Sequence, residues 1–204
     1  MVQSDEKEGA MSTVVILAGG ESRRMQQDKM ALRFGEKTLL ESAVARFSCC
    51  FDTVIISIAD PCKYPEINVR RIVDIRKGCG PIGGLYSALM TTDEEGIFLV
   101  AADMPFADPE AARRIMELAG DCDICLTLDR SSRYEPLFAY YRKTALEQVE
   151  NAISAGNYKL SALAEKVRLR IVAEAELGGL WDEKILFNIN YPEDYERLLD
   201  ENAL

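Results

Sequence analysis

The sequence contains no histidine. This absence excludes Ser-His and Cys-His catalytic pairs and imidazole metal ligands, and it leaves carboxylates, lysine, arginine and bound metal for any chemistry. Positive charge is also scarce, because 24 Lys and Arg stand against 34 Asp and Glu and give a net charge of −10. A chain of this charge repels nucleic acid, so small anionic ligands held by a local cluster of cations are the better fit.

Long apolar runs are missing too. Runs such as residues 97–102 fall far short of the roughly 20 residues that a membrane-spanning helix needs, so we expect no contact with a membrane. Residues 1–11 are acidic and polar, unlike a secretory signal, and we expect them to form a disordered tail on a cytoplasmic protein.

Six cysteines are present, at positions 49, 50, 62, 79, 122 and 125. We expect free thiols, because a disulfide framework belongs to secreted chains. Cys122 and Cys125 have the spacing of a zinc-ligand pair. The strand-like run from Ile124 to Leu128 predicts that these two thiols point to opposite faces, which favours core packing over chelation.

Strand-like and helix-like segments alternate through the first two thirds of the 204 residues. This order predicts an α/β fold with three layers, a mostly parallel sheet covered by helices on both faces, and a single domain over residues 12–204. Residues 188–190 are consistent with an edge strand before the last helix. The expected strands are 13–18, 53–59, 69–74, 97–102, 124–128, 136–141 and 169–173, and the expected helices are 37–47, 82–90, 111–119, 144–155 and 192–199.

The segment Leu17-Ala-Gly-Gly-Glu-Ser-Arg-Arg-Met-Gln-Gln-Asp-Lys29 follows the first expected strand directly. Paired glycines at a strand end let main-chain N–H groups surround an anion, and the cations Arg23, Arg24, Lys29 and Arg33 add local positive charge. The segment has neither the Walker A order nor the glycine pattern of a dinucleotide fingerprint. It therefore predicts a phosphate-binding loop of another class.

Acidic residues and glycines follow the next strands. Asp74 ends one strand and precedes the turn Gly78-Cys-Gly-Pro-Ile-Gly-Gly84, and Asp103 ends a fully apolar strand. Because the carboxyl ends of parallel strands meet at one edge of a sheet, these loops should face one crevice. A carboxylate held there opposite a phosphate loop suits Mg²⁺, which binds one or two carboxylates together with substrate phosphates.

Two further segments are ambiguous from their residues alone. Glu135-Pro-Leu-Phe138 has no single interpretation, and Asn188 and Asn190 are explained by an edge strand as readily as by a binding role. On such a strand these asparagines, two positions apart, would share a face and offer hydrogen bonds to a polar ligand.

Taken in order, these segments resemble the molybdenum cofactor guanylyltransferases, the MobA-like nucleotidyltransferases. The resemblance runs from about residue 12 to residue 200. It is carried by Leu17-Ala-Gly-Gly-Glu-Ser-Arg-Arg-Met25, Asp28-Lys29, Gly80-Pro-Ile-Gly-Gly84, Asp103-Met-Pro105, Glu135-Pro-Leu-Phe-Ala139 and Phe187-Asn-Ile-Asn-Tyr-Pro-Glu-Asp194.

The resemblance implies a Rossmann-like nucleotide-diphospho-sugar transferase fold and the transfer of GMP from GTP to the terminal phosphate of molybdopterin or its molybdenum form, with Mg²⁺ as cofactor. It implies catalysis by Lys29, Arg24 and Asp103, with Asp103 also holding the metal ion. The remaining implied contacts are Leu17, Ala18, Gly19 and Gly20 with the nucleotide, Asp74 with guanosine, and Asn188 and Asn190 with the pterin side.

The sequence departs from the family pattern in two places. Gln26 stands where the family usually has glycine, and Ser57-Ile-Ala-Asp60 lacks an asparagine that many members carry. A cytidylyltransferase of the same fold and a non-catalytic nucleotide-binding partner of molybdoenzyme maturation therefore remain alternatives. We expect a monomer or weak oligomer that makes at most transient contacts with cofactor-biosynthesis proteins or molybdoenzymes.

Overall fold

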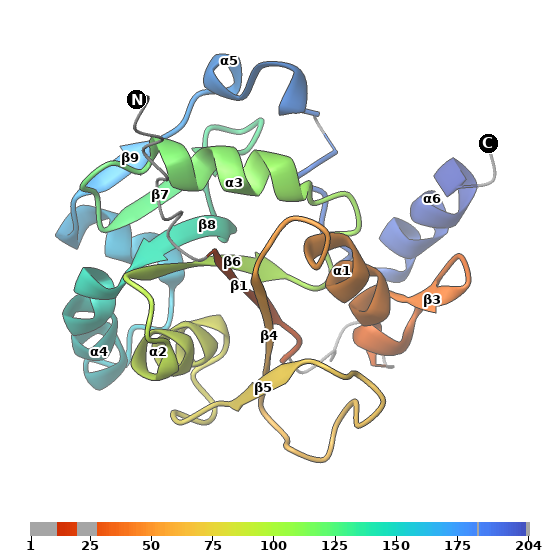
Figure 1. Ribbon diagram of the computed structural model, residues 1–204, viewed down its shortest axis with the longest axis horizontal. Helices are drawn as coiled ribbons and strands as arrows, with labels where there is room; N and C mark the ends of the chain where they lie inside the picture. The colour runs from red at the N-terminus through yellow and green to blue at the C-terminus, as the bar shows by residue number, and fades with distance from the viewer. Residues whose placement is uncertain (1–11, 20–27, 183, 203–204) are drawn as a thin grey trace, which may run out of the picture.

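The computed structural model describes residues 12–19, 28–182 and 184–202. The expected tail over residues 1–11, and Gly20, Arg23, Arg24 and Gln26 of the first loop, lie outside this range. Within it, the chain forms one central sheet with helices on both faces, as predicted (Figure 1).

The described part of the main sheet has seven strands, and the predicted mostly parallel α/β architecture is confirmed. Strands β5, β4, β1 and β6 are parallel neighbours, while β8 runs antiparallel to both β6 and β7. In spatial order the strands are β5 (Arg70–Val73), β4 (Thr53–Ile58), β1 (Thr13–Leu17), β6 (Gly96–Ala101), β8 (Tyr134–Arg142), β7 (Ile124–Leu128) and β9 (Leu169–Ile171).

The helices cover the two faces of the sheet and bury a separate apolar cluster on each. One cluster joins alternate residues of β1 to α1 and α3, and the other joins the remaining β1 residues to α2 and α4. Figure 1 shows α3 on one side of the sheet and α2 and α4 on the other. The helices are α1 (Leu39–Phe47), α2 (Pro81–Thr91), α3 (Pro109–Leu118), α4 (Leu146–Ser154), α5 (Glu174–Leu177) and α6 (Pro192–Asn202).

Short elements complete the fold. A two-stranded hairpin precedes α1, and short 3-10 helices connect the larger elements. These elements are β2 (Arg33–Phe34), β3 (Lys37–Thr38), η1 (Lys29–Ala31), η2 (Lys143–Ala145), η3 (Leu160–Lys166) and η4 (Gly178–Leu180).

Local sequence explains where the helices begin. The Asp108 side chain accepts a hydrogen bond from Ala111 N and Pro109 occupies the first turn, so the predicted start of α3 is confirmed. The α2 helix begins after Gly80, whose φ of 67° lies in the left-handed region that glycine tolerates, and Pro81 fixes the first helical residue.

Two predictions from the sequence are wrong. Residues 188–190 form no strand, because this segment leaves the sheet and packs instead beside Lys29. Cys122 and Cys125 do not point to opposite faces, since Cys122 precedes β7 and both thiols lie in one buried cluster.

The free thiols expected from the sequence are present. All six cysteines are free thiols, and within residues 12–19, 28–182 and 184–202 no group of His, Cys, Asp or Glu is arranged to hold a metal ion by itself. None of the described helices is both long and apolar enough to cross a membrane.

Candidate active site

The carboxyl ends of β1, β4 and β5 are held together beyond the last strand residues. Ala18 N donates a hydrogen bond to Ser57 O at 2.9 Å, and Asp74 N donates to Ile58 O at 3.0 Å. These bonds extend the ladders by one residue and fix the points where the loops leave the sheet. The predicted crevice therefore begins on a rigid edge.

Lys29 and Asp103, which lie 74 residues apart in the sequence, meet at this edge. The Lys29 Nζ atom is 3.5 Å from Asp103 Oδ2, and the two side chains are 14% and 20% exposed. Lys29 comes from η1 and Asp103 follows β6. The prediction that both could serve one bound anion is consistent with this contact.

The segment around Asn190 closes around the same lysine. Lys29 Nζ donates to the carbonyl oxygen of Ile189 at 2.7 Å and to Asn190 Oδ1 at 3.5 Å. Asn188 instead donates its amide to Leu186 O at 3.0 Å, within its own segment. Asn190 therefore contacts Lys29, whereas Asn188 forms its hydrogen bond within its own segment.

A half-buried arginine holds the loop that carries Asp103. The Arg46 guanidinium of α1 donates to Met104 O at 3.1 Å and also to the carbonyl oxygen of Pro105. Burial lowers the pKa of Arg46 to about 10, and it stays charged at neutral pH. This clamp holds the backbone that follows Asp103, so the carboxylate has little freedom to move.

The pKa of Asp103 differs from that of an ordinary surface aspartate. Burial raises the pKa of Asp103, and the charge of Lys29 opposes that rise. Burial also raises the pKa of Glu135, with further increases from the charges of Asp129 and Asp103. Val100 of β6 pairs with Phe138 of the antiparallel strand β8. Continued beyond this pair, the same register brings Glu135 opposite Asp103. The ambiguous Glu135 segment thus lies near the site.

Asp74 belongs to the other side of the site. Its Oδ1 atom accepts a hydrogen bond from Ser57 Oγ at 2.9 Å. Burial raises the pKa of Asp74, and the bond from Ser57 opposes the rise. A methyl group at Gly19 would lie 3.9 Å from Asp74 Oδ2. The structure thus brings Gly19 and Asp74 together, as the sequence suggested.

The glycines of α2 allow a close approach to this corner. A methyl group at Gly84 would lie 2.7 Å from Leu17 Cδ2 and 2.9 Å from Ser57 Oγ. Only glycine fits here without a shift of its neighbours. The residues Leu17, Ala18, Gly19 and Asp74 consequently form one group, and Lys29, Asp103 and Asn190 form another beside it.

Arg33 does not join either group. Its guanidinium donates to the carbonyl oxygen of Glu36 at 2.6 Å, inside the hairpin that contains β2. Arg23 and Arg24 of the predicted cation cluster lie outside the described residues, so that cluster stays a prediction. Gly20 and Arg24 fall outside the described residues, so their predicted contacts remain predictions.

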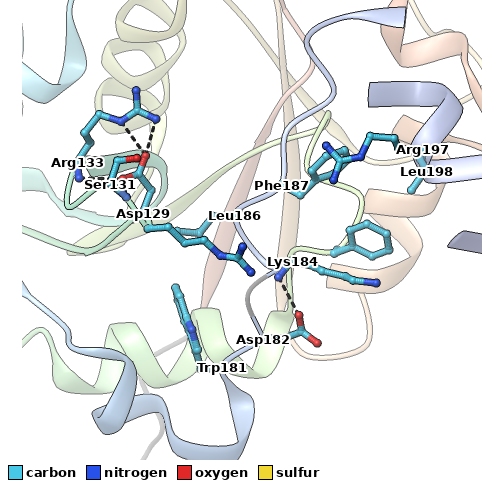
Figure 2. Close-up of a pocket in the computed structure, with 12 residues that line it drawn as sticks. Asp129, Ser131, Arg133, Trp181, Asp182, Lys184, Leu186, Phe187, Arg197 and Leu198 are labelled. Atoms are coloured by element: carbon cyan, nitrogen blue, oxygen red, sulfur yellow. Dashed lines mark hydrogen bonds and ion pairs between the residues drawn. The ribbon is translucent and has the colours of Figure 1, made fainter. Parts of the chain in front are cut away.

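The structure also contains a pocket of about 720 Å³ that the sequence did not predict (Figure 2). We call it the basic aromatic pocket. It lies between the loop from β7 to β8, the segment after η4, and α6. Its aromatic lining residues are Phe106, Trp181 and Phe187, and its cationic ones are Arg130, Arg133, Lys184 and Arg197.

The residues present suit Mg²⁺ rather than a metal held entirely by protein. Asp103 offers one mostly buried carboxylate at a fixed strand end, and no cage of three acidic, cysteine or histidine ligands exists in the described part of the chain. Magnesium typically binds through one or two carboxylates and takes its other ligands from substrate phosphates and water. Asp103 is the residue that would hold it.

Comparison with known proteins identifies relatives along nearly the whole chain. The family model described as the MobA-like NTP transferase domain matches residues 14–171. A protein of Pelotomaculum thermopropionicum named probable molybdenum cofactor guanylyltransferase is 34% identical, with 94% of this chain and 95% of that protein covered. A protein of the same name from Methanosarcina mazei is 30% identical, with 97% and 94% covered.

A solved structure gives the same result for the fold. The molybdopterin-guanine dinucleotide biosynthesis protein A of Archaeoglobus fulgidus superimposes with a TM-score of 0.82 at 29% sequence identity. The alignment covers 94% of this chain and 98% of that one. The likeness in fold therefore extends over nearly the whole chain.

Proposed function

Because this chain belongs to the MobA-like NTP transferase family, we propose that it transfers GMP from GTP to the terminal phosphate of molybdopterin or its molybdenum form. The names of the relatives support the two substrates. The observation that carries the proposal for this chain is the meeting of Lys29 and Asp103 at 3.5 Å on the carboxyl edge of the sheet.

Different residues contact the nucleotide, the reacting phosphates and the pterin. Main-chain groups of Leu17, Ala18, Gly19 and Gly20 contact the nucleotide, and Asp74 accepts hydrogen bonds from the guanosine part. Lys29 and Arg24 bind the phosphates, and Asp103 holds the metal ion. Asn188 and Asn190 face the pterin side. The hydrogen bond between Lys29 and Asn190 and the proximity of Gly19 to Asp74 support this division.

The reaction needs no general base. An oxygen of the acceptor phosphate, already anionic at neutral pH, attacks the α-phosphorus of GTP, and the bond between the α-phosphorus and the bridging oxygen breaks. Pyrophosphate leaves with that bonding pair. The protein therefore acts by aligning the two substrates and by neutralising charge on the phosphates, which agrees with the absence of histidine.

Mg²⁺, when bound, would supply further positive charge to the α-phosphate and the leaving pyrophosphate. Lys29 supplies a fixed cation on the same side, and its contact with Ile189 O keeps it in place before the substrate arrives. A cytoplasmic location, monomeric or weakly oligomeric assembly and transient contacts with other maturation proteins complete the proposal.

Product formation tests the proposal directly. The purified protein is incubated with Mg²⁺, molybdopterin and each of GTP, CTP and ATP, and the dinucleotide and pyrophosphate are quantified. We expect turnover with GTP, and loss of at least about 10²-fold in kcat for Lys29→Gln and for Asp103→Asn, because each change removes one charge at the reacting phosphates. The exposed Lys159→Gln variant is the matched control.

Other outcomes separate the alternatives. Turnover with CTP but not with GTP would assign the chain to the cytidylyltransferases. Tight binding of GTP without any product would indicate a non-catalytic nucleotide-binding partner. Near-normal kcat in either site variant would remove that residue from the mechanism.

A further inference from the structure

Cys122 and Cys125 have no part in the proposed function. Cys122 comes two residues before β7 begins, and Cys125 is the second residue of that strand. Strand β7 is antiparallel to β8, and β8 is antiparallel to β6, so β7 runs in the same direction as β6. The two cysteines therefore lie at the amino edge of the sheet, opposite the carboxyl edge that holds the candidate active site.

The side chains of these two cysteines come together inside the protein. Both are free thiols in the same buried cluster, and they are 9% and 0% exposed. Cys122 N donates to Ala119 O at 3.1 Å, and Cys125 Sγ donates to Ile115 O at 3.4 Å, so both residues are tied to the end of α3. A hydrogen bond joins the two thiols. The fold thus holds two free thiols within reach of each other.

Arginine side chains from the two neighbouring strands lie on the same face of the sheet as Cys125. Cys125 pairs with Tyr140 of β8 and with Arg170 of β9. Residues that pair across a ladder point to the same face, and so does a residue two positions further along either strand. Arg142, two residues after Tyr140, therefore belongs to this face as well.

The two arginines have carboxylate partners, but Arg142 keeps one buried donor. Arg170 Nη2 pairs with Glu176, and Arg142 Nη1 lies 3.8 Å from Oε2 of Glu95, whose side chain is 90% exposed. Arg142 Nε is buried and has no hydrogen-bond partner among the described residues. A negatively charged sulfur atom on the same face would be stabilised by such a donor and by the guanidinium charge.

The pKa values of the two thiols are shifted in opposite directions. The hydrogen bond with Cys125 lowers the pKa of Cys122, and the charge of Arg142 lowers it further, against the effect of burial. The hydrogen bond with Cys122 and burial both raise the pKa of Cys125. Because a thiolate is the attacking species in thiol–disulfide exchange, Cys122 is the thiol that reacts first and Cys125 is the one that follows.

We propose that Cys122 and Cys125 form a reversible oxidation site, which a low-molecular-weight disulfide converts into an internal disulfide. The Cys122 thiolate attacks one sulfur of the oxidant, whose S–S bond breaks and releases a first thiolate. Cys125 then loses its proton and attacks the Cys122 sulfur, and the mixed disulfide breaks and releases a second thiol. The pair loses two electrons and the oxidant gains them, so an excess of small thiol reverses the reaction.

Peptide mass spectrometry tests the proposal on the wild-type protein. Cleavage by trypsin after Arg114 and Arg130 yields a peptide of residues 115–130 whose only cysteines are Cys122 and Cys125. The reduced protein is incubated with glutathione disulfide, quenched with acid, alkylated with iodoacetamide and digested. We expect this peptide to lack two hydrogen atoms and to carry no alkyl group, and to take up two alkyl groups once it has been reduced.

Serine variants distinguish the two thiols. In Cys125→Ser we expect a lasting mixed disulfide between Cys122 and glutathione, because no second thiol is present to displace it. In Cys122→Ser we expect Cys125 to stay unmodified, since it is fully buried. The control is Cys79→Ser, which removes another buried cysteine, 8% exposed, and should leave formation of the internal disulfide unchanged.

The rate of alkylation gives a second measurement on the unmodified chain. At neutral pH, iodoacetamide should alkylate Cys122 at least about tenfold faster than Cys79, which has nearly the same exposed fraction. A role in core packing alone would leave both thiols equally inert, so equal rates would overturn the proposal.

Two further results would also overturn it. One is a wild-type peptide 115–130 that keeps both free thiols while the exposed Cys49 and Cys62 become glutathionylated. The other is a lasting glutathione adduct on Cys122 of the wild-type protein. None of these measurements depends on GMP transfer, so the oxidation site and the proposed function can fail independently.

Discussion

The side chain of Asp28 connects Lys29 to a second loop of the protein. Its carboxylate accepts hydrogen bonds from Tyr64 OH at 2.9 Å, Lys63 Nζ at 2.8 Å and Met30 N at 3.1 Å. Burial raises the pKa of Asp28, but the bonds from Lys63 and Tyr64 outweigh it, so the pKa is lowered overall. The anionic Asp28 caps the 3-10 turn from which Lys29 projects.

We expect Tyr64→Phe to weaken catalysis by loosening this turn. Loss of one hydrogen bond to a charged group should lower kcat/KM for GTP by about threefold to tenfold. The decisive measurement is a double-mutant cycle: in a Lys29→Ala background, Tyr64→Phe should cause little further loss, since its effect passes through Lys29.

The exposed Tyr158→Phe variant serves as the control for the loss of a hydroxyl group. Additive losses in the double variant would mean that Tyr64 acts independently of Lys29. An unchanged kcat/KM in the single variant would remove Tyr64 from the positioning of the turn.

The strands and helices that matter for the site were largely predictable. Apolar runs bounded by Gly, Asp and Pro placed β1, β4, β5 and β6 within a residue or two, because buried parallel strands are nearly continuous in hydrophobicity. The edge-strand interpretation of residues 188–190 is wrong because it depends on the alternation of Asn188 and Asn190 with Ile189, and that local pattern carries no information about the distant Lys29.

The start of α2 gives a prediction about stability. In Gly84→Ala the new methyl group collides with Leu17 Cδ2 and Ser57 Oγ, which overpacks a filled corner at a cost of about 1–3 kcal/mol. The higher helix propensity of alanine returns about 1 kcal/mol. We expect a net loss in the free energy of unfolding, measured by urea denaturation, and a higher KM for GTP because Ser57 also binds Asp74.

Gly179→Ala is the matched control, since no other described atom lies within 4 Å of a methyl group at that position. It should leave the KM for GTP unchanged. A Gly84→Ala variant that is as stable as the wild-type protein, with an unaltered KM for GTP, would show that Leu17 and Ser57 can accommodate the additional methyl group.

Across the whole chain, the least predictable features are those that join distant segments. Lys29 and Ile189 are 160 residues apart, and the pocket gathers side chains from near β6, β7, η4 and α6. Each of these stretches has an ordinary surface composition. The only sequence signals were the single Trp181 and the glycine pair just before it, and neither indicates a ligand until the fold assembles the pocket.

The fold also buries three carboxylates, and their burial lowers the stability of the protein. Burial raises the pKa values of Asp74, Asp103 and Glu135, which means that the folded state binds their protons more tightly than the unfolded state does. Each such group lowers the free energy of unfolding as the pH rises from its ordinary pKa through its raised one. These three carboxylates thus reduce the stability of the protein at neutral pH, and two of them, Asp74 and Asp103, are the residues proposed to contact the nucleotide and the metal ion.

Asp74→Asn isolates this cost for one residue. The amide keeps an oxygen for Ser57 but never ionises, so the variant should gain stability relative to the wild-type protein as the pH rises above 3.8, the ordinary pKa of aspartate. The difference should reach a plateau once wild-type Asp74 is fully ionised, while affinity for GTP falls. Urea denaturation at a series of pH values measures it, with the exposed Asp121→Asn as control. A stability difference that is constant with pH would mean that burial of Asp74 imposes no such cost.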